Sequence, residues 1–202
     1  MEDIVQAPDS PLIMVDGYVR RRGESTLSLV CLSSAGRIFT AEDDSGYPLF
    51  HASGLPFGMS LSGRCNVHDV VAGRRLFDFR HHLLGYKSGW VVESLDGDKL
   101  CSVRREKCPA GHLNIVATVP TQGDVLVTMW PNLHEANTAM AVCFDRKIVA
   151  RIDLVDTPGM DDPDTRSEQE RTACHAYVAA GVDLSLIMVL MLCCSEIGHS
   201  WN

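Results

Sequence analysis

The eleven residues from Leu184 to Cys194 read LSLIMVLMLCC, and Ser185 is the one polar residue among them. A helix that is apolar on every side is buried, either in protein or in lipid. Eleven helical residues span about 16 Å, roughly half of the hydrocarbon core of a bilayer. A window extended upstream to Ala173 is longer, but it places Asp183 near its middle at a cost of about 2.5–3.5 kcal/mol. The length therefore favours a helix that is buried in protein.

This segment needs a large apolar enclosure from the rest of the chain. Burying its ten apolar side chains contributes roughly 15–30 kcal/mol before the entropy of ordering the chain is subtracted. Asp183 suits the N-cap position, so the sequence predicts a central helix over residues 183–197. The side chains that we expect to fill the enclosure as a plug are Leu184, Leu186, Ile187, Val189, Leu190 and Leu192.

Short β-like segments occupy the chain upstream of this helix. Residues alternate in character along 26–31, 125–130 and 148–154, and a period of two puts each alternate set on one face of a strand. About a dozen such strands, without a long amphipathic helix between them, predict a mainly β fold with one α-helix. We expect a closed antiparallel barrel, which is wide enough to hold the helix. The turn signals between strands are Asp44–Gly46, Ala72–Gly73, Asp96–Asp98 and Gln122–Asp124.

A single domain accounts for the 202 residues. We expect a flexible N-terminal tail over 1–11, a barrel domain over 12–198 with an acidic loop at 155–171, and a tail over 199–202. The polar, acidic N-terminus lacks the features of a secretory signal, so the eight cysteines are expected to be reduced in an intracellular, cytoplasmic protein. Peripheral membrane or nuclear placement stays open. The net charge of −8 disfavours nucleic acid as a partner.

Several stretches resemble a known family. Leu61–Arg64 followed by Leu76–Arg80 resembles the central motif of the LURP-one-related family. Val149–Asp153 is similar to the strand before that family's final loop, and Tyr177–Ile187 to its last strand and helix. The resemblance implies the Tubby C-terminal-like fold, shared with phospholipid scramblases, in which twelve strands enclose a hydrophobic C-terminal helix. The acidic loop and the connection Cys108–Gly111 depart from the family pattern.

The resemblance also implies a function. No enzymatic activity is established for the family, and phosphoinositide binding is suggested by analogy with Tubby. The leading hypothesis is a non-enzymatic intracellular interaction or scaffold module whose surface binds a protein partner or an anionic phospholipid headgroup. The alternative is a membrane-associated, scramblase-like protein with its C-terminal segment in lipid. The sequence indicates neither the identity of the partner nor the oligomeric state.

Clusters of basic residues supply the candidate binding groups. If neighbouring strands bring several guanidinium groups together, they can form bidentate hydrogen bonds with a phosphorylated headgroup. A solvated outer strand face or protection of an edge strand explains the same residues without a ligand, and both interpretations stay open. The candidate headgroup residues are Arg74, Arg75, Arg80, Arg104 and Arg105.

Other motifs lack the partners that their chemistry needs. Val155–Gly159 looks like the DxxG element of GTPases, but no lysine of the chain follows a glycine as a P-loop requires. The acidic run after Asp153 does not match EF-hand spacing. Cys101, Cys108 and His112 lack the paired-cysteine spacing of zinc sites, and no G-x-S-x-G occurs. We therefore expect no enzymatic activity, no cofactor and no bound metal.

Overall fold

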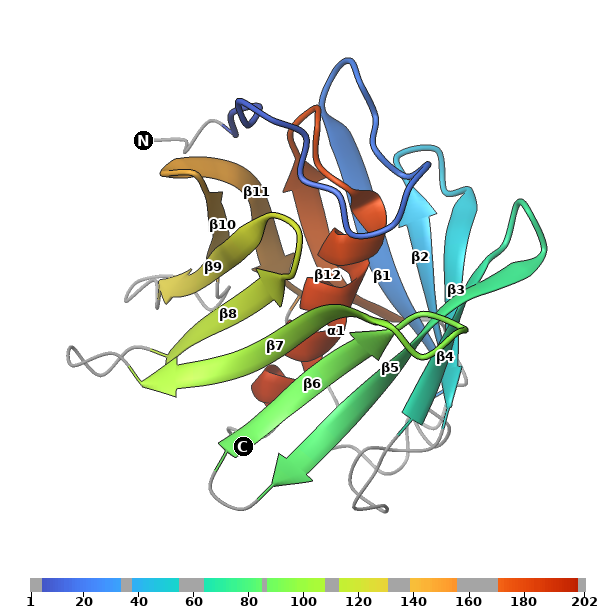
Figure 1. The fold of residues 1–202 in the computed structure, drawn as a ribbon. Helices are drawn as coiled ribbons and strands as arrows, with labels where there is room; N and C mark the ends of the chain where they lie inside the picture. The colour runs from blue at the N-terminus through green and yellow to red at the C-terminus, as the bar shows by residue number, and fades with distance from the viewer. Residues whose placement is uncertain are drawn as a thin grey trace.

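Twelve strands and one C-terminal helix make up the structure, a computed structural model that describes residues 5–33, 38–54, 64–84, 87–107, 113–130, 139–155 and 171–199. Strands that are adjacent in sequence pair antiparallel, and β1 also pairs with β12, so the sheet closes into a barrel (Figure 1). The predicted closed antiparallel barrel is confirmed. The elements are β1 (Ser25–Ser33), β2 (Ile38–Asp43), β3 (Pro48–Gly54), β4 (Arg64–Asp69), β5 (Arg74–Leu84), β6 (Lys87–Glu93), β7 (Lys99–Lys107), β8 (Leu113–Val119), β9 (Gly123–Trp130), β10 (Ala139–Phe144), β11 (Lys147–Leu154), β12 (Arg171–Val178) and α1 (Leu184–His199).

Alternation along the strands directs one face into the barrel. Leu27 on β1 pairs with Ala176 on β12, and Ala176 pairs in turn with Ile152 on β11. Ile152 pairs with Met140 on β10, and all four side chains are fully buried. Tyr177, the next residue along β12, lies on the outer face and is 47% exposed. The period of two in the sequence therefore builds a continuous apolar inner wall.

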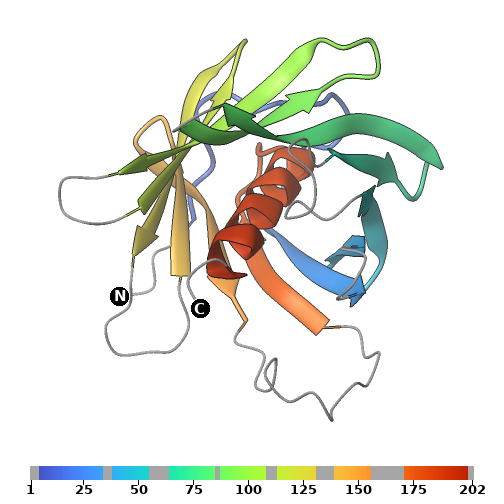
Figure 2. The same cartoon turned by 90° about the horizontal axis from the view of Figure 1, so that it is seen from below.

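Helix α1 runs through the interior of the barrel, with strands around it (Figure 2). Its closest strands are β11, β12 and β1. The six expected plug residues are at most 4% exposed. The helix begins one residue later and ends two residues later than the predicted range of 183–197, a normal uncertainty at helix ends. Large aromatic side chains from β3, β5 and β6 complete the core, namely Phe50, Phe77, Phe79 and Trp90.

The N-terminal residues 5–24, which we call the cap segment, cross the end of the barrel where α1 begins (Figure 1). Leu12 is fully buried there, and its N–H donates a hydrogen bond to Gly181 O at 2.8 Å. Its carbonyl oxygen accepts a hydrogen bond from Asp183 N at 2.9 Å. Gly181 has a φ of 86°, which glycine adopts without steric strain, and it turns the chain from β12 into the barrel.

The Asp183 carboxylate joins the cap segment to α1. Its Oδ2 accepts hydrogen bonds from Met14 N at 2.8 Å and from Val15 N at 2.7 Å. Its Oδ1 accepts from Ser185 N and Ser185 Oγ, both at 2.7 Å, as an N-cap side chain does. Burial raises the pKa of Asp183, while these hydrogen bonds act in the opposite direction. One carboxylate therefore both caps the helix and anchors the segment that covers it.

The flexible tail predicted up to Pro11 contacts the barrel in the part that the structure describes. Gln6 N donates a hydrogen bond to Ile148 O at 2.7 Å, and Lys147 Nζ lies 2.5 Å from Asp9 Oδ1. This stretch belongs with the cap segment, because its backbone and side chains bind β11 and its turn. Other predictions fall outside the described residues, namely those on residues 61–63, 108–112, 156–170 and 200–202.

Candidate functional site

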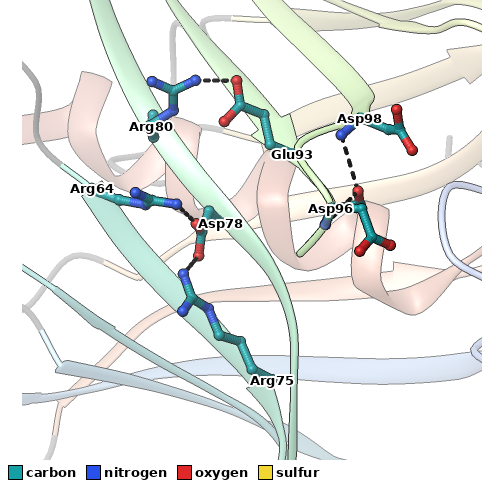
Figure 3. A network of polar contacts seen from close by, with 8 residues as sticks. Arg64, Arg75, Asp78, Arg80, Glu93, Asp96 and Asp98 are labelled. Carbon is teal, nitrogen blue, oxygen red and sulfur yellow. Dashed lines mark hydrogen bonds and ion pairs between the residues drawn. The ribbon is translucent and has the colours of Figure 1, made fainter.

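The outer face of β4, β5 and β6 carries three arginines and two carboxylates, which we call the arginine network (Figure 3). Arg64 and Arg75 both form ion pairs with Asp78, and Arg80 pairs with Glu93. The two sequence neighbours of Asp78 are phenylalanines of the core, so alternation turns Asp78 outward. Its side chain is nevertheless only 2% exposed. A carboxylate on the outside of the barrel is therefore buried beneath the side chains around it.

The arginine network contains two of the five predicted headgroup residues, Arg75 and Arg80. Arg64 joins them because the register between β4 and β5 places it opposite Arg80. Three guanidinium groups against two carboxylates leave one positive charge in excess. A phosphorylated headgroup at this position would compete with Asp78 and Glu93 for the same N–H donors.

The other three predicted arginines lie elsewhere. Arg104 is on the outer face of β7, where its Nε lies 2.9 Å from Glu106 Oε1. Arg105 follows it in the strand and faces the interior, with its guanidinium carbon 5.0 Å from the centre of the Trp90 ring. Arg74 is exposed at the start of β5. The five predicted residues thus occupy both faces of the sheet and do not form one site.

A second outer surface extends across β12, β1, β2, β3 and β4. It holds two concave sites of about 570 Å³ and about 400 Å³ that share Glu42. Strand pairing aligns the side chains of this surface in two rows. One row is His68, His51 and Thr40, and the other is Glu42, Ser28 and His175. We call these residues, with Asp44 at their rim, the acidic groove.

Carboxylates set the charge of the acidic groove. Glu42 and Asp44 have no ion-pair partner among the described residues, whereas Asp43 beside them is held by Arg20 at 3.5 Å. In the described part of the chain, neither concave site is lined by lysine or arginine. Burial lowers the pKa of His51, and the neighbouring His68 lowers it further, so the His51 imidazole is neutral at pH 7. The surface is consequently negative at neutral pH.

Exposed apolar side chains border the acidic groove. Tyr47 in the turn between β2 and β3 is 68% exposed, and Val71 in the turn between β4 and β5 is 74% exposed. The two turns are adjacent, because Val70 N donates a hydrogen bond to Leu49 O at 3.0 Å. Tyr177 on β12 lines the smaller concave site, as do Asp44 and Gly46 of the turn that carries Tyr47. Aromatic residues of this kind are enriched at protein interfaces.

Sequence reasoning did not select the residues of the acidic groove. They come from five strands, and His175 reaches Ser28 only because β12 pairs with β1 across the closure of the barrel. The contact is a hydrogen bond between Ser28 Oγ and His175 Nδ1 at 2.9 Å. The sequence does show polar residues at alternate positions of each strand. Which strands are neighbours must also be known before these residues can be assigned to one surface.

Five of the described cysteines are buried: Cys65, Cys101, Cys174, Cys193 and Cys194. Burial raises the pKa of the Cys101 and Cys194 thiols to about 12, so they are protonated and poor metal ligands at neutral pH. Within the described ranges, no three His, Cys, Asp or Glu side chains are grouped so that they could hold a metal ion. Nor does any helix within those ranges have the length and hydropathy that crossing a bilayer requires.

Comparisons with known proteins agree with the fold and with the motifs. No curated protein matches the chain significantly. An X-ray structure of a protein from Arabidopsis thaliana shares the fold, with a TM-score of 0.58 over 94% of this chain and 99% of that one, at 15% sequence identity. The sequence model of the LURP-one-related family matches residues 26–195. The chain therefore belongs to the LURP-one-related family, as its motifs predict.

Proposed function

We propose that this chain is a non-enzymatic interaction module that binds a protein partner through the outer face of its barrel. The observation that carries the proposal is the filled interior, because α1 from Leu186 to Cys194 is at most 3% exposed. A ligand in the core would have to displace this helix. The two concave sites of the outer face, by contrast, are open to a macromolecule.

An intracellular, cytoplasmic setting is part of the proposal. The cysteines support it, because the seven that the structure describes are free thiols, as is usual in a reducing compartment. Expression of a fluorescent fusion with cell fractionation tests the location. Recovery in the secreted fraction would contradict it.

Site-specific photocrosslinking tests the proposed function. The purified chain carries p-benzoylphenylalanine at one outer-face position, either the exposed Tyr177 on β12 or Thr118 on β8, and is irradiated in an extract of the source cells. We expect a discrete adduct from at least one position, and excess unlabelled chain should suppress it because the site saturates. If neither position gives a saturable adduct, the proposed function is wrong.

An anionic phospholipid headgroup at the arginine network is the second candidate. The excess positive charge favours it, as do the side chains of Arg64 and Arg80, which are 55% and 41% exposed. Flotation with phosphatidylcholine vesicles that contain a phosphoinositide tests it. The double variant Arg64→Gln, Arg80→Gln should lose flotation, whereas Arg104→Gln, on another strand, should retain it. Equal flotation of both variants would exclude the network as the site.

A further inference from the structure

We propose that the acidic groove binds a basic, partly apolar peptide segment of a partner protein in an extended conformation. The inference rests on the proposed function and names the chemistry of the partner. Its starting point is the pair of concave sites that meet at Glu42.

The closed barrel determines how a peptide can bind. Since β1 pairs with β12, the sheet formed by the described strands has no free edge to which a partner could add a strand. Recognition must therefore use side chains of the outer face. The acidic groove covers five neighbouring strands spaced about 4.8 Å apart, so it spans about 19 Å, the length of about six extended residues. A peptide crossing the strands along the two rows would contact both concave sites.

Charge selects a basic peptide. Glu42 lies where the two concave sites meet and Asp44 lies at the rim, and neither has an ion-pair partner among the described residues. A lysine or arginine side chain can therefore pair with them without displacing another cation. In the arginine network, by contrast, every guanidinium group already pairs with a carboxylate, so a charged ligand there would have to displace an existing ion-pair partner. Nucleic acids and anionic lipid surfaces are repelled by the same charges.

Apolar contacts in the two concave sites supply the rest of the specificity. Leu32 and Val70 line the larger concave site, and Val30 and Tyr177 line the smaller one. Binding energy in protein interfaces is concentrated in such well-packed apolar anchors, while charges set the orientation and the rate of encounter. The expected ligand therefore has basic residues at its centre and an apolar or aromatic residue towards each end.

Fluorescence anisotropy with a designed probe tests the groove. The probe is a labelled peptide of about ten residues, long enough to overhang the six-residue span, with central lysines and arginines, a valine and a tyrosine at its ends, and a glutamate-substituted version as its counterpart. The double variant Glu42→Gln, Asp44→Asn removes two charges from the groove. The matched control, Asp96→Asn with Asp98→Asn, removes two charges at the exposed turn between β6 and β7.

We expect the basic probe to bind the wild type saturably and the groove variant about tenfold more weakly, with the control variant within about twofold of wild type. The glutamate-substituted peptide should not bind. The proposal is overturned if the basic probe fails to bind, or if both variants weaken binding equally, because net charge rather than the groove would then explain the attraction. Near-ultraviolet circular dichroism checks that both variants are folded.

Histidine protonation gives an independent readout. Burial and the neighbouring His68 lower the pKa of His51 below its ordinary value of 6.5, so lowering the pH through that pKa adds positive charge to the groove, and the basic probe should then bind several times more weakly. The other titratable and charged groups near His51 are Glu42, His68 and Asp69, which line the same concave site, and Arg75, which pairs with Asp78. Replacing the three histidines of the groove, His51, His68 and His175, by glutamine should remove the pH dependence.

The failures of the two proposals are distinguishable. An adduct from Thr118 but not from Tyr177 in the photocrosslinking experiment would overturn the groove assignment and leave an interaction module intact. Absence of adducts from both positions would contradict the proposed function itself, whatever the probe peptide does.

Discussion

Replacing Asp183 by alanine should loosen the cap segment and destabilise the barrel. The carboxylate accepts hydrogen bonds from Met14 N, Val15 N, Ser185 N and Ser185 Oγ. Alanine offers no acceptor to replace the carboxylate. The serine hydroxyl can rotate to a new partner and Val15 N is only partly buried, but Met14 N and Ser185 N stay buried.

The size of the effect follows from these two amides. A buried donor without an acceptor costs about 1–3 kcal/mol, so the two amount to about 2–6 kcal/mol. Removing a carboxylate whose burial is itself unfavourable offsets part of this. We expect Asp183→Ala to lower the free energy of unfolding by about 2–4 kcal/mol. Asp183→Asn should lie between alanine and wild type, because its single amide oxygen can accept from only one pair of donors.

Urea unfolding followed by tryptophan fluorescence measures the free energy of unfolding. Trp90 reports the transition, because it is 1% exposed in the folded protein and becomes exposed to solvent on unfolding. Asp96→Ala, at an exposed turn, is the control and should change stability by less than about 0.5 kcal/mol. Hydrogen exchange gives a local measure, because Asp183→Ala should selectively speed exchange at Met14 and Val15. A stability equal to the control, or unchanged exchange at these amides, would refute the reasoning.

The pH dependence of stability has a definite sign at this site. The pKa of Asp183 is raised in the folded protein above the ordinary value of 3.8, so folding favours the protonated carboxyl. The stability that the raised pKa of Asp183 contributes is fully present when the pH is below the ordinary pKa of 3.8. It is lost as the pH rises through the pKa that Asp183 has in the folded protein. Asp183→Asn should remove this part of the pH profile. A variant whose profile matches that of the wild type would contradict the assignment.

Three further predictions concern the core and the outer face. Leu190→Ala should lower the free energy of unfolding by about 2–5 kcal/mol, because Leu190 is fully buried in α1, and a loss below about 1 kcal/mol would contradict that burial. The Cys194 thiol, with a pKa of about 12, should resist a thiol reagent in the native protein and react once denaturant is added; rapid labelling of the native chain would contradict its burial. Asp78→Asn should lower the free energy of unfolding by about 1–2 kcal/mol, discounted for the exposure of its arginine partners, and hence the melting temperature by about 2–8 °C; an unchanged melting curve would contradict this.

The fold could be predicted because the deciding signals are local. A helix apolar on every side must be enclosed, and its length was too short to favour lipid. The strands can be recognised because the character of the residues alternates along them with a period of two. The cap segment was missed although Leu12 and Met14 belong to an apolar run after Pro11, since the hydrogen bonds that hold it come from residues near Gly181 and Asp183, far along the chain.

The binding residues could not be predicted in the same way, because a cluster in sequence is not a cluster on a sheet. Arg104 and Arg105 are neighbours in sequence, but successive strand residues point to opposite faces, so they diverge. Arg64 was missed for the converse reason. It meets Arg80 through the pairing of β4 with β5, and that register includes a bulge between Val67 and His68 that no local pattern announces.

The position of α1 after β12 has a consequence for synthesis. A ribosome completes all twelve strands before it makes the segment that gives their inner faces something to pack against. The pairing of β1 with β12 adds a second delay, because the first strand waits for the last. Such distant contacts form slowly, and the nascent chain meanwhile exposes an apolar inner wall that is prone to aggregate. Translation of this protein should therefore depend on chaperones until residues 184–199 leave the exit tunnel.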